Sequence, residues 1–338
     1  MSSIQKTSWI IGLSCLFLCA CARDEMNQPV YYSIPAGFDE PHFPPDNLFS
    51  DARFELGRSL FYDPVLSVDS SISCASCHRP EFAFTDRKTV SEGVFGRAGT
   101  RNAPSLANVA YQPYFLREGG VPTLEMQIGV PIQEHNEFDH NLLVIAEKLM
   151  RSDHYRDQSL RAYGRLPDPF VITRSIACFE RALISGQSAY DRFLQGDIHA
   201  LSPDAQKGMK LFHSEPFNCS KCHSGILFTN HAFENNGLYE QYADEGRKRL
   251  TGLESDAALF KVPSLRNVDW TMPYMHDGKL SSLEDVIDHY AAGGRNHPHK
   301  SVLVAGFPIN DDQKRQLLAF LKSLTDHQFI DNRNFRLP

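Results

Sequence analysis

The stretches Cys74-Ala75-Ser76-Cys77-His78 and Cys219-Ser220-Lys221-Cys222-His223 share one pattern, two cysteines separated by two residues and followed by histidine. This spacing is typical of c-type haem attachment, in which the thiols bond to the porphyrin vinyl groups and the imidazole binds the iron. Two copies predict two haem c groups, attached through Cys74, Cys77, Cys219 and Cys222, with His78 and His223 as iron ligands. Zinc and a redox thiol pair are alternatives. Structural zinc requires four close ligands where each motif offers three, and a thiol pair gives the histidine no role.

Residues 1–20 have the composition of an export signal. Lys6 is the only charged side chain before residue 23, the stretch 9–20 is apolar, and Leu18-Cys19-Ala20-Cys21 is similar to a bacterial lipobox. We expect a lipoprotein-type signal peptide at 1–20 and a lipid on Cys21, with an ordinary signal peptide cleaved nearby as the alternative. Both interpretations predict the periplasm or cell envelope, an oxidising compartment where c-type cytochromes are assembled.

Residues 21–45 are rich in proline and are predicted to form a flexible tether. No later stretch is long and apolar enough to span a bilayer, so the lipid is the predicted membrane contact. The formal net charge of −7 argues against a nucleic-acid partner. Cys178 has no part in haem attachment, and its apolar neighbours predict a buried thiol.

The sequences around the two motifs also repeat. Before them stand Gly57-Arg58-Ser59-Leu60-Phe61 and Gly208-Met209-Lys210-Leu211-Phe212, and after them Pro104-Ser105-Leu106-Ala107-Asn108-Val109 and Pro263-Ser264-Leu265-Arg266-Asn267-Val268. The offset is 145 residues at the motifs and 159 at the later loops, so the second copy carries an insertion. After these loops, Pro113 aligns with Pro273 if the register slips by one residue, and Leu124 aligns with Leu283 at the offset of 159 again. A period this long predicts duplicated domains rather than a solenoid.

Between and after the motifs, apolar residues recur at helical spacing and strand signals are few. We expect one helix over 142–163 and another that begins at Ser281 as N-cap, with Glu284 completing a capping box. The predicted fold is mostly α: two tandem cytochrome c-like haem domains with long loops, related by internal duplication, at 46–195 and 196–338.

The two haem pockets are predicted to differ. The offset of 159 places Pro131 opposite Tyr290; a tyrosine phenolate can bind haem iron, whereas proline has no ligand atom. The second haem is therefore expected to be closed by a protein ligand and the first to be open. Met275, His276 and His289 are rival ligands near Tyr290. The first pocket is assigned Gln127 and Glu137, a carboxylate that could move a proton between the oxygens of bound peroxide.

From about Leu56 to Leu324 the chain resembles the bacterial di-haem cytochrome c peroxidases and the related MauG proteins. The resemblance is carried by both haem motifs, Arg101-Asn102-Ala103-Pro104-Ser105-Leu106, Pro131-Ile132 followed by Glu137, and Pro263 to Val268 through Thr271-Met272-Pro273-Tyr274-Met275-His276-Asp277-Gly278. It implies Gln127 and Glu137 as catalytic residues and Tyr290 as distal ligand of the second haem, where the peroxidases have Met and MauG has Tyr. It also implies a calcium ion between the haems, held by Asn102 and by backbone oxygens of Thr271 and Pro273.

Two positions depart from the family. Many of the peroxidases carry a histidine at the position of Val94, which caps the resting first haem, so this first haem is expected to be accessible without prior reduction. The family tryptophan between the haems corresponds to Arg117, which cannot be oxidised as an indole can.

These features predict a periplasmic-side peroxidase that reduces hydrogen peroxide to water. The N-terminal domain would react with peroxide, and the C-terminal domain would pass on electrons from a donor such as a small cytochrome c or a copper protein. The alternatives are a MauG-like peroxide-dependent oxidase of a protein or small molecule, and a non-catalytic di-haem electron carrier. A carrier has no use for an open haem beside a carboxylate. Formation of a homodimer stays open.

Overall fold

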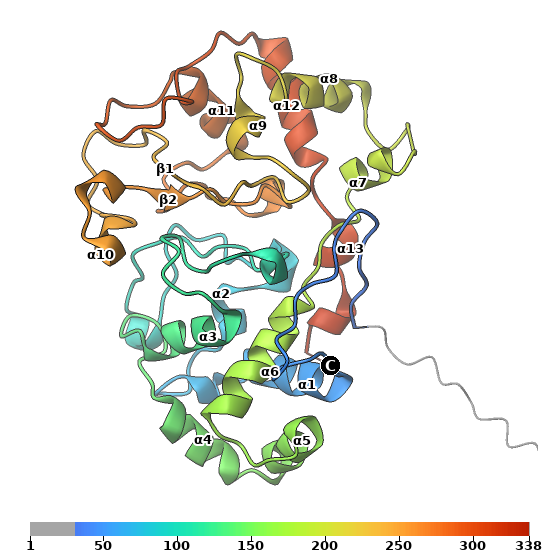
Figure 1. Cartoon of the computed structure of the whole chain (residues 1–338), viewed down its shortest axis with the longest axis vertical. Coiled ribbons are helices and arrows are strands. Elements are labelled where there is room, and N and C mark those ends of the chain that lie inside the picture. Colours follow the sequence, from blue (N-terminus) through green and yellow to red (C-terminus); the bar gives the residue numbers. More distant parts are fainter. Residues whose placement is uncertain (1–30, 338) are drawn as a thin grey trace, which may run out of the picture. The chain divides into compact units, whose positions relative to one another are not determined.

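The computed structural model describes residues 31–337, so the predicted signal peptide and Cys21 lie outside the described residues. Helices carry most of the regular structure, which confirms the mostly α class. The α-helices are α1 (Asp51–Tyr62), α2 (Cys74–Cys77), α3 (Leu124–Gln133), α4 (Leu142–Met150), α5 (Asp153–Tyr163), α6 (Pro169–Arg181), α7 (Ala189–Leu194), α8 (Pro203–Phe212), α9 (Cys219–Cys222), α10 (Lys248–Thr251), α11 (Leu283–Ala291), α12 (Asp311–Lys322) and α13 (His327–Ile330) (Figure 1). Across 31–337, no helix has both the length and the apolarity needed to cross a membrane.

Short 3₁₀-helices and a two-stranded sheet complete the regular structure. The 3₁₀-helices are η1 (Pro64–Leu66), η2 (Pro80–Phe82), η3 (Val94–Gly96), η4 (Val109–Tyr111), η5 (Glu254–Asp256), η6 (Val268–Trp270) and η7 (Arg333–Phe335). Strands β1 (Phe233–Glu234) and β2 (Phe260–Lys261) pair antiparallel, with Phe233 opposite Lys261 and Glu234 opposite Phe260. Loops therefore form much of the surroundings of the two haem motifs.

Two helix pairs, α1 with α6 and α8 with α12, support the two motifs (Figure 1). Each pair approaches closely at a glycine. A Cβ atom on Gly57 would lie 1.9 Å from the carbonyl oxygen of Ser175, and one on Gly208 would lie 1.9 Å from that of Gln316. Any larger residue would force the helices apart, which explains why glycine opens both repeated stretches before the motifs.

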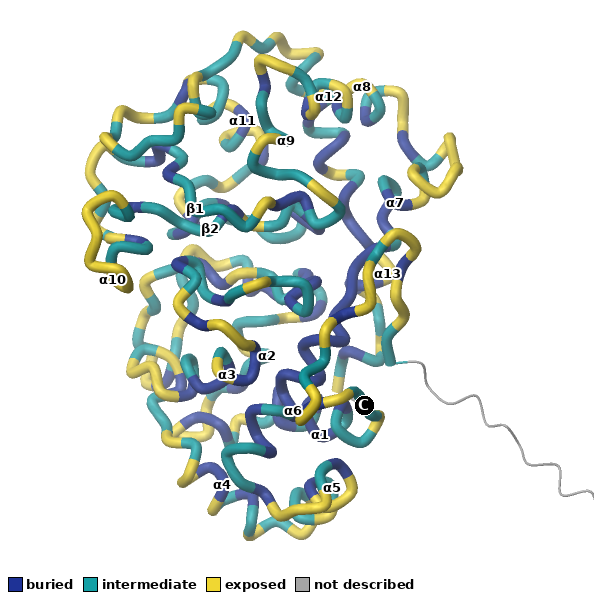
Figure 2. Tube along the Cα trace, viewed as in Figure 1, coloured by how far each residue is buried: buried dark blue, intermediate teal, exposed yellow. Residues whose placement is uncertain are grey.

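The buried apolar residues form two clusters (Figure 2). The first is built mainly from residues between 54 and 183, around α1 and α6. Cys178 on α6 is fully buried, as predicted. The second surrounds α8, α11 and α12. Phe329 and Phe335, which the sequence assigns to the second domain, pack in the first cluster, and the Tyr62 hydroxyl donates to the Phe335 carbonyl at 2.7 Å. The end of the chain thus returns to the N-terminal core.

The segment 31–45 lies against the folded body rather than forming a tether. The Tyr31 ring stacks on Phe54 of α1 with centroids 4.4 Å apart, and the Tyr111 hydroxyl donates to the Asp39 carbonyl at 2.9 Å. Burial of these aromatic rings stabilises the packed segment. This gain offsets the conformational entropy that an extended proline-rich chain would keep. The tether prediction is therefore wrong for 31–45, and residues 21–30 lie outside the described part of the chain.

Two helix predictions need correction. The helix expected over 142–163 is divided into α4 and α5, because Ser152 adopts an extended conformation with φ −98° and ψ 118° and starts a new helix. The N-cap of α11 is Ser282 rather than Ser281. Its hydroxyl accepts from the Asp285 N–H at 3.0 Å, and the Asp285 carboxylate accepts from the Ser282 N–H at 3.1 Å. The capping box is therefore one residue later than predicted, closed by Asp285 instead of Glu284.

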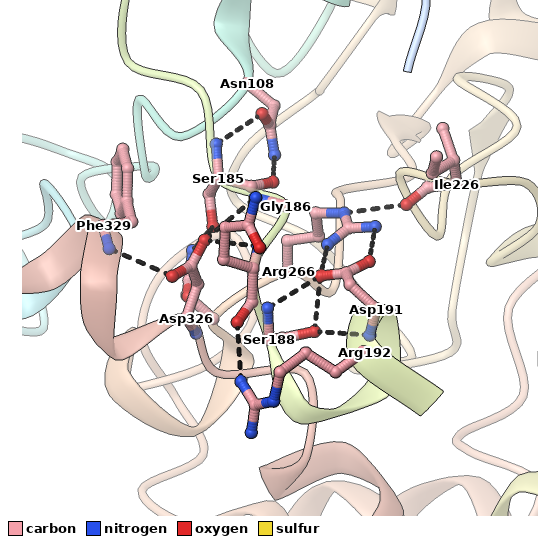
Figure 3. A network of polar contacts seen from close by, with 12 residues as sticks. Asn108, Ser185, Gly186, Ser188, Asp191, Arg192, Ile226, Arg266, Asp326 and Phe329 are labelled. Atoms are coloured by element: carbon pink, nitrogen blue, oxygen red, sulfur yellow. Dashed lines mark hydrogen bonds and ion pairs between the residues drawn. The ribbon is translucent and has the colours of Figure 1, made fainter. Parts of the chain in front are cut away.

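A buried polar network occupies the segment that follows α6 (Figure 3). Arg266 donates two hydrogen bonds of 2.8 Å to Asp191 on α7, and both side chains are almost fully buried. Ser185 accepts from Asn108 through its carbonyl at 2.8 Å and donates to Asp326 through its hydroxyl at 3.1 Å. The network ties residues before, within and after the predicted domain junction into one hydrogen-bonded unit.

Candidate haem sites

The first motif forms α2, and His78 ends this helix. Ser73 and Ser76 cap the helix reciprocally, which fixes both cysteines on one turn. The His78 Nδ1–H donates to the Phe84 carbonyl at 3.0 Å, so Nε2 is left to face an iron. Burial lowers the pKa of His78, and the imidazole is therefore neutral, which is the form that binds metal.

The second motif has the same local design on α9. The His223 Nδ1 lies 3.1 Å from the Phe228 carbonyl and 3.2 Å from the Pro263 carbonyl, so its Nε2 is also directed away from the backbone. Pro263 opens the repeated loop after the second motif, and the corresponding Pro104 carbonyl also acts on His78. In both copies the repeated loop helps to orient the predicted iron ligand. The four motif cysteines are free thiols and partly exposed, as attachment of a porphyrin requires.

The structure brings Glu137 to the first motif. Its charge raises the pKa of both Cys74 and Cys77, which requires proximity to the two thiols. Desolvation by the surrounding protein, and secondarily the charge of Glu134, raise the pKa of Glu137 to about 7, although the residue as a whole is exposed to solvent. A carboxyl group with this pKa exchanges protons readily at neutral pH.

Gln127 and Val94 are the other two residues predicted to shape the first pocket. Gln127 lies on α3, and its Oε1 is buried without a hydrogen-bond partner among the described residues. A buried acceptor left in this way is costly, so a group in the pocket that donates to it would be stabilising. Val94 is fully buried and its N–H donates to the Glu137 carbonyl at 2.9 Å. Its side chain offers no ligand atom to an iron.

Tyr290 lies on α11 close to the second motif. Burial raises the pKa of Tyr290 to about 12, a hydrogen bond with Asn236 opposes this, and Cys222 and Cys219 raise the pKa by smaller amounts. The rivals are engaged elsewhere: the His289 Nε2 lies 2.9 Å from the Asn236 carbonyl, and the Met275 Sδ accepts from the Asn236 side chain at 3.0 Å. The His276 ring stacks on Phe260 with centroids 4.2 Å apart. This arrangement favours Tyr290 as the distal ligand.

Comparison with known proteins decides the family. Residues 51–199 match the family model for di-haem cytochrome c peroxidase. Methylamine utilization protein MauG of Methylorubrum extorquens is 34% identical over 313 residues, covering 90% of this chain and 88% of the relative. The chain belongs to the di-haem cytochrome c peroxidase and MauG family. Membership makes it an oxidoreductase and implies two haem c groups, which the residues around both motifs fit.

Two further relatives span both branches of this di-haem family. Cytochrome c551 peroxidase of Nitrosomonas europaea is 34% identical over 292 residues, covering 84% of this chain and 82% of the relative. A crystal structure of a MauG-like protein associated with microbial copper homeostasis has a TM-score of 0.85 at 34% identity, covering 91% of this chain and 99% of that one. A di-haem peroxidase or MauG-like role therefore fits the whole of the described fold.

The calcium site implied by the family does not fit the residues present. Asn102 lies near the Thr271–His276 loop, and its N–H donates to the His276 carbonyl at 2.9 Å. However, the Arg117 Nη2 donates to the Asn102 carbonyl at 2.7 Å and to its Oδ1 at 3.2 Å. Calcium bound to that oxygen would lie beside a guanidinium, and at a separation of about 4 Å the repulsion is roughly 8 kcal/mol for an effective dielectric constant near 20. The residues around Asn102 therefore disfavour a calcium ion held by Asn102, Thr271 and Pro273.

The sequence did not indicate the residues that orient the predicted ligands. The Phe84 and Phe228 carbonyls are backbone groups, so no side-chain pattern marks them. Asn236 contacts Tyr290, Met275 and His289, yet it is separated from them by at least 39 residues. These positions emerge from the loops that surround each motif, and a motif search does not detect them.

Proposed function

We propose that this protein reduces hydrogen peroxide to water at the haem attached through Cys74 and Cys77, with electrons supplied by a small redox protein. The observation that carries the proposal is the placement of Glu137 beside the first motif, in surroundings that hold its pKa near 7. Gln127 and Val94 support it, since one offers an unpartnered polar atom and the other no iron ligand.

Each of these side chains has a separate task. When bound, the haem supplies the redox chemistry. Glu137 takes a proton from the oxygen of hydrogen peroxide near the iron and returns it to the leaving oxygen, which departs as water. Gln127 binds and orients the substrate through its side-chain amide. Two electrons and two further protons balance the reduction of one peroxide to two waters.

Tyr290 gives the second site a different task. A phenolate oxygen beside Cys219 and Cys222 would close the distal side of the second haem, which then serves to receive and pass on electrons. The donor is a small cytochrome c or a copper protein. Peroxide is thereby restricted to the first site.

The proposal is tested by Glu137→Gln, which keeps the shape of the side chain and removes its ability to carry a proton. We expect the first peroxide-driven step, followed by stopped-flow absorbance, to slow by about a hundredfold or more, since acid–base assistance is typically worth 10²–10⁴-fold. Glu134→Gln is the matched control, because it removes a neighbouring charge and leaves the proton carrier in place. A wild-type rate in a folded, fully haem-loaded Glu137→Gln protein would remove Glu137 from the mechanism.

The second candidate is a MauG-like oxidase that uses peroxide to modify a protein or small molecule. Tyr290 near the second motif favours it, because this position carries tyrosine in MauG. The similarity to MauG and to a MauG-like protein associated with copper homeostasis points the same way. One assay distinguishes the two functions. A peroxidase consumes reduced cytochrome c or copper protein in proportion to peroxide, whereas an oxidase leaves the donor reduced and adds mass to its target.

The proposed architecture is a pair of duplicated cytochrome c-like domains, at 46–195 and 196–338. It is supported by the corresponding helix pairs α1–α6 and α8–α12, and by the hydrogen bond from the histidine of each motif to a backbone carbonyl.

We also propose that the protein lies in the periplasm or cell envelope and is lipid-anchored at Cys21. Cys21→Ser should move it from the membrane fraction to the soluble fraction. Light scattering of the purified protein tests the homodimer.

A further inference from the structure

Two backbone hydrogen bonds with the same pattern join the loops between the two haem motifs. The Asn102 N–H donates to the His276 carbonyl at 2.9 Å, and the Lys261 N–H donates to the Arg117 carbonyl at 2.6 Å. The offset of 159 residues relates Asn102 to Lys261 and Arg117 to His276. The two halves therefore contact each other through equivalent backbone hydrogen bonds. The side chains at the equivalent positions differ.

The same offset holds throughout this region. The bridges Phe115–Val121 and Tyr274–Leu280 are both antiparallel and lie 159 residues apart. The slip that aligned Pro113 with Pro273 is therefore wrong, and the structural counterpart of Pro273 is Tyr114. By this offset Gln112 corresponds to Thr271, so both carbonyl-bearing positions of the expected calcium site have counterparts in the first half.

On that counterpart side, the chain supplies its own cation. The Lys261 ammonium donates to the Gln112 Oε1 at 2.5 Å and to the Tyr114 carbonyl at 2.9 Å. Lys261 thus occupies the position equivalent to Asn102, and its charged end binds oxygens at the positions equivalent to Thr271 and Pro273. The ammonium group donates hydrogen bonds to the oxygens that a metal ion would otherwise bind.

On the Asn102 side the cation is Arg117, which by the offset of 159 is the counterpart of His276. The Asn102 Nδ2 donates to the Lys88 carbonyl at 2.8 Å, which turns its Oδ1 toward Arg117. Burial lowers the pKa of Arg117 to about 10 and the charge of Arg101 also lowers it, whereas Asp277, Asp244 and Glu118 raise it, so the guanidinium remains charged at neutral pH. The cation that faces Asn102 is therefore part of the fold itself.

We propose that Arg117 and Lys261 replace metal ions at the contact between the two halves, so that the haem-loaded protein binds no calcium there. Lys261 binds the Gln112 and Tyr114 oxygens, and Arg117 binds both oxygens of Asn102. Because both belong to the chain, neither can be removed by a chelator. This holds whether the protein acts as a peroxidase or as an oxidase.

The test uses the haem-loaded protein with Arg117→Gln as the variant. Arg249→Gln is the matched control, since Arg249 also donates to the acidic cluster, with its Nη2 2.8 Å from the Glu118 Oε1, but does not touch Asn102. Each protein is dialysed against EGTA and then against millimolar calcium chloride, freed of unbound ion, and analysed for calcium by plasma mass spectrometry. Thermal unfolding is recorded in EGTA and in calcium.

We expect wild type and Arg249→Gln to hold far less than one calcium per chain and to have the same Tm in both buffers. Arg117→Gln should bind calcium at least about tenfold more tightly than wild type, because the competing charge is gone. A wild-type protein that retains about one calcium per chain, or whose Tm falls in EGTA, overturns the proposal. This wild-type result decides the matter even if Arg117→Gln does not fold.

Discussion

We expect the pH dependence of the first peroxide-driven step to follow the pKa of Glu137. Desolvation, and secondarily the charge of Glu134, raise this pKa from 4.5 to about 7. Only the carboxylate form can take a proton from hydrogen peroxide, so the rate should rise with pH through about 7 and level off above it. At about pH 5.5 roughly 3% of the carboxyl groups are ionised, whereas with an ordinary pKa about 90% would be. The step should therefore be about 30-fold slower at pH 5.5 than at its plateau.

Stopped-flow absorbance of the oxidised protein mixed with peroxide measures this step before any electron donor is required. Glu134→Gln should move the midpoint to lower pH, because it removes one cause of the raised pKa, but not as far as 4.5, because desolvation is the larger cause. Glu137→Gln should give a slow and flat profile. The reasoning is refuted if the wild-type rate is constant from about pH 5.5 to 8, or if Glu137→Gln keeps the same rise.

Other predictions concern the second site and the junction. Tyr290→Phe should alter the optical and EPR spectrum of one haem and leave the other unchanged, while Met275→Leu should change neither; the reverse pattern would assign the ligand to Met275. Asp191→Asn should lower the free energy of unfolding by about 3–5 kcal/mol, because it leaves the Arg266 guanidinium buried without its partner. Asp204→Asn, which breaks a largely exposed ion pair, should cost less than about 1 kcal/mol in the same denaturant titration, and equal losses would contradict this reasoning.

The sequence predicted the parts of the site that rest on local chemistry. The two haem motifs and the helical class follow from spacings of a few residues, and the structure places Glu137 and Tyr290 beside the expected motifs. Gly57 and Gly208 are instructive, since each opens a repeated stretch and each turns out to permit a helix contact that no other residue allows. The repeated glycine therefore indicates close packing, but the helix that it contacts can be identified only from the structure.

The calcium prediction rested on three positions without their neighbours. Asn102 is present as the family pattern requires, but its oxygen faces Arg117, a residue 15 positions later. Arg117 stands where the family has a tryptophan, and its charge matters here as much as its inability to relay electrons. A cation that replaces a neutral indole changes which other cations can bind nearby, and this effect depends on distance in space.

The junction has a consequence for electron transfer that neither motif reveals. Ser185 donates to Asp326, and the N–H of Phe329 donates to the other oxygen of the same carboxylate at 3.0 Å. Asn108 and Asn267, at matching positions of the two repeated loops, both bind Ser185 (Figure 3 shows the Asn108 contacts). A hinge motion between the halves would break the long-range bonds that Ser185 makes with Asn108, Asn267 and Asp326, and each broken one costs about 1–3 kcal/mol when a group is left unsatisfied. We therefore expect the two proposed haem sites to keep a fixed separation during turnover.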